Sequence, residues 1–355
     1  MKIIQVMPVF DLAGAEIMCE NLCYELTKMG HKVIVISMYT QHTPITDRLE
    51  SFGIDVRYLD KKLGFDFSIL GKMRKIFKKE KPDVVHTHLY TTTYAVAAAA
   101  FSGVKRIIHT VHNVAEKENT KLGRYINNIL FRTFKVIPVA LSEIIKDTII
   151  REYGKKSSDV PVVLNGMPLD KYIPKTNYSA NKGVKIIHIG RFSKQKNHIR
   201  LIEAFEKVVE KYPDTTLNLF GAGELLDDIK KLVSEKCLES SVTFCGLSNN
   251  IPKELSQNDI FCLPSDYEGV PMTLIEAMAS AMPIVATSVG GVPDMLTHGK
   301  DALLTDATKD DVANALCEMV ESEELRETLG KNSLKRANDF SSKTMAEQYV
   351  KIYMS

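Results

Sequence analysis

Short apolar runs rich in Val and Ile alternate with amphipathic helical stretches along the whole chain. A run that is apolar on both faces is typical of a parallel strand buried between helices, and this alternation indicates repeated βαβ units. The pattern therefore predicts an α/β protein. Its helices include residues 15–29 and 94–101. Its strands are predicted at residues 3–7, 32–38, 55–58, 84–86, 106–110, 136–141, 185–189, 216–220, 242–245, 260–264, 283–287 and 302–304.

The gap between the two groups of strands predicts two Rossmann-like domains, as the chain length also does. A further strand at Val163-Leu164 leads into Asn165-Gly166, which we interpret as a turn, and a polar, proline-containing stretch follows,. We place the boundary there, with an N-terminal domain at residues 1–166 and a C-terminal domain at 167–339. Residues 340–355 have helical spacing and are expected to pack back on the N-terminal domain.

The composition is that of a globular protein, with 45% hydrophobic and 25% charged residues,. The net charge of +2 offers no general attraction to nucleic acid,. It is unevenly distributed, because residues 1–170 hold 24 Lys and Arg against 18 Asp and Glu, whereas the remainder holds 22 against 26. Much of the basic excess lies in residues 57–81, which contain nine basic and three acidic residues.

Apolar residues recur at the period of a helix within that basic segment. A basic amphipathic helix can rest on an anionic membrane, with Lys72, Lys75, Lys78 and Lys79 toward the lipid. In the alternative, the apolar stripe covers the sheet and the basic side chains are solvated. The stripe consists of Ile69, Leu70, Met73, Ile76 and Phe77.

Cysteine usage and the N-terminus bear on the cellular compartment. The six cysteines have neither disulfide-framework nor zinc spacing, and the first apolar run is too short for a signal peptide,. We therefore expect a cytoplasmic protein, located at the inner face of the cell membrane if the basic helix binds lipid.

The loop after the predicted strand 185–189 carries two cations, Arg191 and Lys196. Open α/β sheets bind ligands at the carboxyl ends of their strands, and a guanidinium and an ammonium beside a helix N-terminus can hold a diphosphate. For either residue alone, an exposed basic loop is the simpler interpretation.

A second candidate segment follows the predicted strand 260–264. Pro271 suits the first position of a helix, so backbone amides from about Gly269 to Thr273 are expected at the same edge of the sheet. Glu276 is an acid in an otherwise apolar helix, which is costly unless the carboxylate finds hydrogen-bond donors such as ribose hydroxyls. Its alternative role is to cap a neighbouring loop.

The first half offers two further signals. Gly14 lies where a predicted strand gives way to a helix, and a glycine there suits a tight turn whose amides can bind a phosphate or sugar oxygen. His86 and His88, and then His109 and His112, lie at the ends of two successive strands. No carboxylate cluster accompanies them, so we expect a His beside a sugar rather than a zinc site.

In combination, these motifs resemble the retaining, GT-B fold enzymes of glycosyltransferase family 4 over nearly the whole chain. The motifs are Gly14-Ala15-Glu16, residues 83–88, residues 110–113, Asn165-Gly166, Gly190-Arg191-Phe192 with Lys196-Asn197, residues 221–224, and Glu268 and Glu276 with seven residues between them. The resemblance implies two Rossmann-like domains with parallel sheets facing an interdomain cleft. No D-x-D triplet occurs in the chain, and neither a metal nor another cofactor is expected.

The resemblance also implies roles for individual residues. Arg191 and Lys196 hold the diphosphate of a nucleotide-sugar and neutralise the leaving group. Glu276 binds the ribose, Glu268 faces the donor sugar, and His112 faces that sugar from the N-terminal domain, with His109 as the alternative. Further donor contacts are implied for Gly14, Gly269, Val270, Pro271, Met272 and Thr273. The first glycine of the common Gly-Gly form of the first loop is Ala13 in this chain.

The leading hypothesis is a metal-independent retaining glycosyltransferase, either a hexosyltransferase or an N-acetylhexosaminyltransferase. It moves a sugar from a nucleotide-sugar, for which we expect a UDP-sugar, to a glycan or lipid-linked acceptor in bacterial surface polysaccharide synthesis. The N-terminal domain binds the acceptor, and the C-terminal domain binds the donor. Two alternatives stay open: a sugar-nucleotide epimerase of the same fold, which needs no acceptor, and a non-catalytic subunit that binds a nucleotide-sugar.

Overall fold

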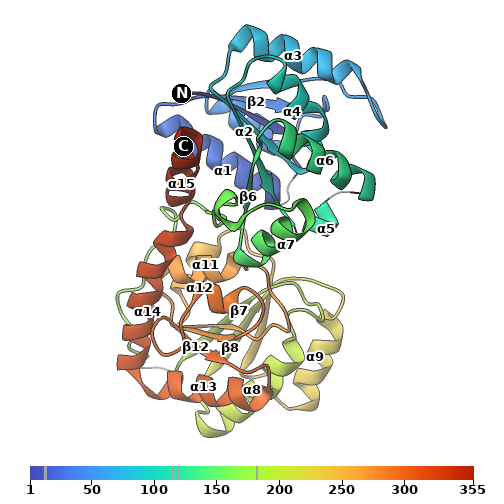
Figure 1. The fold of residues 1–355 in the computed structure, drawn as a ribbon. Helices are drawn as coiled ribbons and strands as arrows, with labels where there is room; N and C mark the ends of the chain where they lie inside the picture. Colours follow the sequence, from blue (N-terminus) through green and yellow to red (C-terminus); the bar gives the residue numbers. More distant parts are fainter. Residues whose placement is uncertain (12–13, 114, 119, 181–182) are drawn as a thin grey trace. The chain divides into compact units, whose positions relative to one another are not determined.

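The computed structural model describes residues 1–11, 14–113, 115–118, 120–180 and 183–355. Two compact units are present, coloured along the chain in Figure 1. Unit 1 contains residues 1–168 and 339–355, and unit 2 contains residues 169–338. The chain thus leaves unit 1 close to the boundary expected after Gly166 and returns to it for the last helix.

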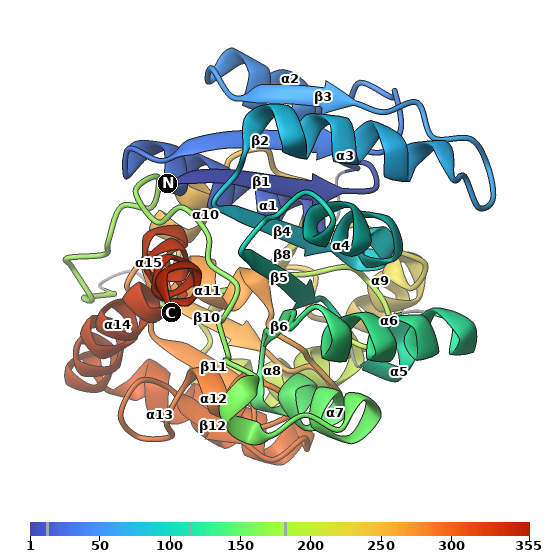
Figure 2. The ribbon, with the colours of Figure 1, turned by 45° about the horizontal axis from the view of Figure 1, so that its top comes forward.

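Unit 1 has a parallel sheet in the strand order β3-β2-β1-β4-β5-β6, which can be followed in Figure 2. The six strands predicted between residues 3 and 141 are confirmed, with small shifts at their ends. They are β1 Lys2–Met7, β2 Lys32–Ser37, β3 Asp55–Tyr58, β4 Val84–His88, β5 Arg106–Val111 and β6 Ile137–Ala140. The helices of this unit are α1 Gly14–Lys28, α2 Pro44–Ser51, α3 Ser68–Glu80, α4 Thr92–Ala100, α5 Ala115–Glu118, α6 Lys121–Thr133, α7 Glu143–Tyr153 and α15 Ser342–Met354.

Side chains that alternate along these strands enter two apolar clusters on opposite faces of the sheet. On β1, Ile4 and Val6 join a cluster with residues of α3, α4 and α6. Ile3 and Met7 point the other way and join residues of α1 and α15. The sheet is therefore buried on both faces, as its near-continuous apolar strands predicted.

The basic helix α3 covers the sheet with its apolar stripe. Ile69, Met73 and Phe77 are fully buried in the cluster that α3 shares with α4. The apolar stripe thus covers the sheet, as the alternative interpretation predicted, because these side chains are packed in the hydrophobic core. Among the described residues, no helix combines the length and the apolarity needed to cross a membrane.

The segment Asn165-Gly166 differs from the sequence prediction. Residues 163–164 form no strand, and the preceding Val162 makes only an isolated bridge to Ala140. Gly166 lies in irregular chain rather than in a turn. A Cβ atom there would lie 2.4 Å from the carbonyl oxygen of Ser341, so a glycine is needed where the returning chain passes.

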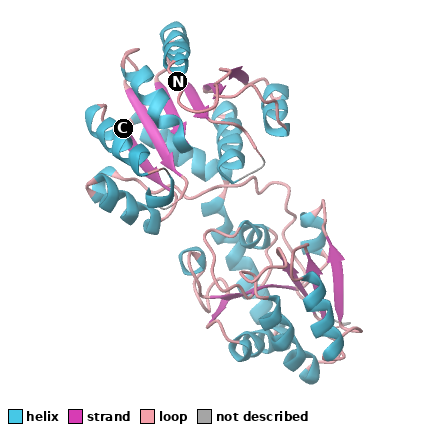
Figure 3. Cartoon of the chain, turned by 90° about the vertical axis from the view of Figure 1, so that its right-hand side faces the viewer, coloured by secondary structure: helices cyan, strands magenta, loops and turns pink. Residues whose placement is uncertain are grey.

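Unit 2 repeats the architecture, with a parallel sheet in the order β12-β11-β10-β7-β8-β9 and helices on its faces (Figure 3). Its strands are also confirmed. They are β7 Lys185–Ile189, β8 Thr216–Phe220, β9 Val242–Gly246, β10 Ile260–Leu263, β11 Ile284–Thr287 and β12 Leu303–Thr305. The helices are α8 His198–Lys211, α9 Leu226–Glu235, α10 Ile251–Ser256, α11 Met272–Ala279, α12 Val292–Met295, α13 Lys309–Glu321 and α14 Glu323–Ala337.

Candidate functional site

The carboxyl ends of β11, β10, β7 and β8 lie side by side at one edge of the sheet in unit 2. The chain order reverses at β7, which has β10 on one side and β8 on the other. Ligands of open α/β sheets bind at such a switch point. With the exception of Gly14 and His112, every predicted site residue lies on the loops after β7 and β10 or on α11.

Lys196 and Glu268 form the central contact of this edge. The Lys196 ammonium lies 2.6 Å from Glu268 Oε1, and the Ser265 hydroxyl donates to the same oxygen at 2.6 Å. The Glu268 side chain is only 4% exposed, and that of Lys196 16%. The loops after β7 and β10 are therefore joined by a largely desolvated ion pair, which fixes the position of both side chains.

Further hydrogen bonds support this contact. Gln195 donates from Nε2 to the Tyr267 carbonyl at 3.0 Å. Asn197, two residues after Gln195, caps α8 by accepting a hydrogen bond from the Arg200 amide. Arg200 in turn donates to Asp266 at 2.7 Å and to the carbonyl of Pro264. The cap and the arginine thus hold the start of α8 against the loop that carries Glu268.

Arg191 is placed differently from Lys196. Its side chain is 74% exposed, and its guanidinium lies 3.2 Å from Glu224 Oε2. An exposed pair of this kind contributes little to stability and is easily exchanged for another anion. Arg191 is therefore an exposed cation at the sheet edge, whereas Lys196 is largely buried.

Glu276 receives a hydrogen bond that the sequence did not indicate. The hydroxyl of Tyr172 donates to Glu276 Oε1 at 2.8 Å. Burial is the main cause that raises the pKa of the Glu276 carboxyl above its ordinary value,. One oxygen of the carboxylate is thus held by Tyr172, and the other can accept hydrogen bonds from a ligand.

The segment of residues 269–273 begins α11 one residue later than predicted. Pro271 is the residue that precedes the helix rather than its first residue, and α11 starts at Met272. The first amides of a helix have no intrahelical acceptor. In addition, the Thr273 hydroxyl oxygen is buried without a hydrogen-bond partner. This turn therefore retains polar groups that a ligand can satisfy.

Pairs of glycines bring two neighbouring loops close to these residues. A Cβ atom on Gly290 would lie 1.9 Å from the Glu268 carbonyl oxygen, and one on Gly291 would lie 2.1 Å from that of Gly269. Likewise, a Cβ on Gly221 would lie 2.0 Å from the Gly190 carbonyl oxygen. The sequence shows the Gly290-Gly291 pair, but it does not show that this pair packs against the backbone of Glu268 and Gly269.

Two buried histidines lie beneath the loop after β7 and were also missed. His188 donates from Nδ1 to the Cys262 carbonyl at 2.9 Å, and its Nε2 is buried without a partner. The His198 ring stacks on Phe192 with centroids 4.0 Å apart. Burial is the main cause that lowers the pKa of His188 to about 4 and that of His198 to about 2, so both rings are neutral.

In unit 1, Gly14 is the first residue of α1. Its φ lies outside the left-handed region, and a Cβ atom there would meet no atom within 4 Å. Nothing in the described surroundings of Gly14 therefore requires a glycine, and the predicted turn before it includes residues 12–13, which lie outside the described residues. Ala13, which replaces the first glycine of the motif, lies outside the described residues.

The two alternative histidines of unit 1 lie on opposite sides of the sheet. His109 is fully buried, with Nδ1 3.0 Å from the Thr87 hydroxyl and Nε2 3.4 Å from Glu118 Oε2. His112 is partly exposed, and its backbone amide donates to Glu118 Oε1 at 3.0 Å. Glu118 thus holds the end of β5, and His112 is the ring of the two that a ligand can reach.

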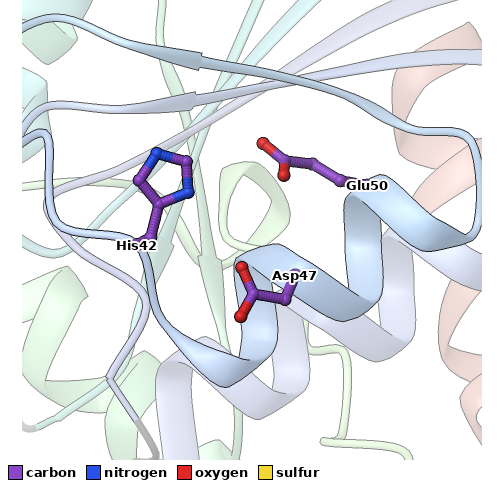
Figure 4. A group of neighbouring side chains, drawn as sticks. All are labelled: His42, Asp47 and Glu50. Carbon is purple, nitrogen blue, oxygen red and sulfur yellow. The ribbon is translucent and has the colours of Figure 1, made fainter.

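A separate polar cluster lies on α2 and the loop before it. His42, Asp47 and Glu50 offer ligand atoms within 4.8 Å of one another, and Figure 4 shows the three side chains. All three are exposed, and the Tyr58 hydroxyl lies 3.2 Å from both His42 Nδ1 and Glu50 Oε1. Because Tyr58 already bridges two of the groups, we assign the cluster no role in binding a metal.

The chain also matches known protein families over most of its length. Residues 12–171 match the model of Glycosyltransferase Family 4, and residues 172–336 match that of Glycosyl transferases group 1. The chain belongs to this family of glycosyltransferases. It is an enzyme of the transferase class with the GT-B fold.

Two curated relatives and one solved protein illustrate the likeness. A UDP-Gal:α-D-GlcNAc-diphosphoundecaprenol α-1,3-galactosyltransferase of Escherichia coli is 28% identical over 304 residues, covering 79% of each chain. An N-acetyl-α-D-glucosaminyl L-malate synthase of Bacillus anthracis is 28% identical over 307 residues, covering 81% of this chain and 79% of the relative. The Anabaena protein HepE, solved in complex with UDP, has a TM-score of 0.80 at 19% identity over 99% of both chains.

Proposed function

We propose that this chain is a retaining, metal-independent glycosyltransferase that uses a UDP-sugar. The transferred group is a hexose or an N-acetylhexosamine, and the acceptor is a glycan or lipid-linked saccharide of bacterial surface polysaccharide synthesis. The names of the relatives support this choice, because the Escherichia coli enzyme acts with UDP-Gal on a diphosphoundecaprenol-linked sugar. The Anabaena protein of the same fold was solved with UDP.

The observation that carries the proposal is the ion pair of Lys196 with Glu268 at the switch point of unit 2. A buried ammonium held by a carboxylate keeps donors for a further anion, because it carries three N–H groups. The exposed Arg191 adds a guanidinium that can bind two phosphate oxygens at once. Together they supply two positive charges where the diphosphate of a nucleotide-sugar is proposed to bind, without a metal ion.

The remaining residues complete the proposed donor site. The ribose hydroxyls donate to the Glu276 oxygen that Tyr172 does not hold. The amides of Met272 and Thr273 bind diphosphate oxygens, since anions are stabilised at a helix N-terminus. Glu268 accepts hydrogen bonds from hydroxyls of the sugar, and its position is fixed by Lys196 and Ser265.

In the proposed reaction, the two cations act on the negative charge that develops on the leaving diphosphate. As the bond from the anomeric carbon to the diphosphate oxygen breaks, Lys196 and Arg191 stabilise the charge that develops on the diphosphate. The acceptor oxygen bonds to the anomeric carbon on the same face, and its proton passes to the departing phosphate oxygen. The configuration is retained, and no side chain has to act as base.

The test is transfer to undecaprenyl-diphosphate-linked N-acetylglucosamine from a panel of UDP-hexoses and UDP-N-acetylhexosamines, in EDTA. We expect one donor to give an α-linked product by nuclear magnetic resonance, and Glu276→Ala to abolish transfer while circular dichroism stays unchanged. A β-linked product, or activity that EDTA removes, contradicts the proposed mechanism. Isomerisation of a UDP-sugar without acceptor indicates an epimerase instead.

We also propose contact with an anionic membrane, carried by the loop before α3 rather than by its apolar stripe. Leu63 and Phe67 are 94% and 75% exposed, and Phe65 lies beside Phe67 with ring centroids 4.8 Å apart. Exposed lysines of α3 follow directly along the chain. Apolar side chains beside lysines suit the boundary of a negatively charged bilayer, which is where a lipid-linked acceptor resides. The lysines are Lys72, Lys75, Lys78 and Lys79.

A further inference from the structure

A continuous chain of buried hydrogen bonds joins His112 to the C-terminal helix of unit 1. It crosses β5, β4 and β1 before it reaches α15, and every member except His112 is buried. None of these side chains carries a formal charge when its histidines are neutral. The chain runs through His112, His88, Gln5, Tyr353, His86, Thr110 and Tyr349.

Sheet register brings these residues onto one face. Gln5 pairs with His86 on the neighbouring strand, and His88 pairs with Thr110. In a parallel sheet, paired residues point to the same side, and so do residues two apart on one strand. All of them therefore face α15, whereas His109 faces the opposite layer. Apolar surroundings make each unmade hydrogen bond in such a chain expensive.

The part of the chain next to His112 has a defined direction. Gln5 Oε1 can only accept, so His88 donates to it from Nε2 at 2.9 Å,. A neutral imidazole has one N–H group, which leaves His88 Nδ1 as an acceptor. His112 Nε2, 3.0 Å away, must then be the donor to it.

The part near α15 is consistent with the same direction. Gln5 donates from Nε2 to the Tyr353 oxygen at 3.3 Å, and Tyr353 donates to His86 Nδ1 at 2.7 Å. His86 then donates from Nε2 to Thr110 at 2.8 Å, and Thr110 donates to the Tyr349 oxygen at 2.7 Å. No two donors and no two acceptors face each other anywhere along the chain.

We propose that Gln5 and His88 are positioning residues that hold His112 in its Nε2–H tautomer, with the lone pair on Nδ1. In this state Nδ1 of His112 accepts a hydrogen bond from a hydroxyl of the transferred sugar. The same nitrogen carries no N–H group that could donate. This second step rests on the proposed function. It makes the enzyme selective for a donor sugar with a hydroxyl at the position that His112 meets.

The direction of these hydrogen bonds requires neutral histidines, and their pKa values agree with that. Burial is the main cause that lowers the pKa of His86 and of His88 well below the ordinary value. Burial, together with His109, lowers the pKa of His112 to about 3. A proton added to His86 or His88 would place an N–H group on the ring nitrogen that accepts a hydrogen bond in the chain.

The test uses the full chain with 15N-labelled histidine at neutral pH, in which long-range 1H–15N spectra distinguish the two tautomers of each ring. The signals of His112 are identified by their loss in His112→Asn. We expect the Nε2–H pattern in the wild type. Gln5→Met removes the acceptor for His88 at nearly constant volume, so His112 should become a mixture of tautomers.

Thr87→Val is the matched control, since Thr87 lies next to His88 on β4 but contacts His109 instead of the hydrogen-bond chain. It should shift the His109 signals and leave those of His112 unchanged. If Gln5→Met does not fold, Tyr353→Phe serves instead, because it frees the Gln5 amide to rotate and should also yield a mixture. An Nδ1–H or doubly protonated His112 in the wild type, or a His112 pattern that neither variant changes, overturns the proposal.

The spectra need no substrate, so they separate this proposal from the proposed function. In an active enzyme, Gln5→Met should lower kcat about tenfold, the value of one hydrogen bond to the sugar, and leave the Kd of UDP unchanged. The expected tautomer in a chain that transfers no sugar would preserve the positioning and refute the function. Sugar transfer by an enzyme whose His112 tautomer does not depend on Gln5 would support the proposed function and refute the positioning of His112.

Discussion

The two units use opposite means to position their candidate binding residues. In unit 2, charged side chains on loops at the sheet edge pair with other charges, as Lys196 does with Glu268 and Arg191 with Glu224. In unit 1, uncharged side chains within the sheet orient His112 through hydrogen bonds. Charged side chains are thus concentrated where a diphosphate is proposed to bind. Neutral side chains held by hydrogen bonds lie where an uncharged sugar is proposed to bind.

The largest effect should come from the ion pair of unit 2. Lys196→Met should lower kcat/KM about 1,000-fold, because it removes a charge that stabilises the leaving group. It should also lower the free energy of unfolding by about 3 kcal/mol, since Glu268 is left buried without its cation. Steady-state kinetics and urea unfolding measure the two effects.

The double variant Lys196→Met with Glu268→Gln separates catalysis from stability. It removes both charges, so most of the lost stability should return while transfer stays low. Lys194→Met, an exposed lysine of the same loop, is the control and should behave as the wild type. An active double variant would mean that the charge of Lys196 is structural only.

The next effect concerns the glycines that bring loops to this ion pair. Gly290→Ala places a Cβ atom 1.9 Å from the Glu268 carbonyl oxygen at a residue with φ of +54°. The clash and the strained φ should cost about 3 kcal/mol of unfolding free energy and weaken UDP binding. Gly269→Ala, where a Cβ meets nothing within 4 Å, is the control. Equal stability of the two variants would contradict the close approach.

Acid should destabilise unit 1 more than unit 2. His86, His88 and His112 in unit 1, and His188 and His198 in unit 2, have folded pKa values below the unfolded value of about 6.5,. The stability they contribute is complete above about pH 6.5 and is lost as the pH falls toward their folded pKa values, because the unfolded chain takes up protons first. Each histidine should cost up to about 1.4 kcal/mol per pH unit.

Hydrogen exchange read by mass spectrometry at pH 7.5, 6.5 and 5.5 follows the two units separately, after correction for the intrinsic exchange rate. Peptides from β4 should lose more protection than peptides from β7. The same loss in both units, or a gain in β4, would show that the histidines of unit 1 are not held neutral.

The smallest effect belongs to the proposed membrane surface of unit 1. Phe65→Ser with Phe67→Ser should weaken binding to anionic vesicles, and neutralising Lys72, Lys75, Lys78 and Lys79 should weaken it by up to about 1 kcal/mol for each lysine. Ile173→Ser replaces an exposed apolar residue of unit 2 and is the control. Binding that ignores lipid charge, measured by vesicle flotation, would exclude this surface.

The sequence predicted the strands well because parallel strands buried on both faces are apolar along their whole length. It predicted Lys196 as a site residue because the loop that carries it follows a strand that ends at one edge of a sheet, and Glu276 because an acid in an apolar helix needs hydrogen-bond donors. The role of Glu268 was implied only by the resemblance to the family. The contact between Lys196 and Glu268 could not be predicted, since it depends on β7 and β10 being neighbours, and 72 residues separate the two side chains along the chain.

The errors have physical causes as well. The apolar stripe of α3 has the same period whether it faces lipid or the core, so only packing decides between them. Gly166 reads as part of a turn, but it is needed because Ser341, far away in the sequence, passes within contact. Tyr172 precedes the second sheet, and nothing in its local sequence points to Glu276.

Isothermal titration of UDP and UMP tests the central claim most directly, because it needs neither the donor sugar nor the acceptor. The account predicts that the wild type binds UDP at least about tenfold more tightly than UMP, since Lys196 holds the second phosphate. In Lys196→Met with Glu268→Gln, this preference should disappear while the Kd of UMP stays the same. Equal affinities for UDP and UMP in the wild type, or an undiminished preference in the double variant, would contradict it.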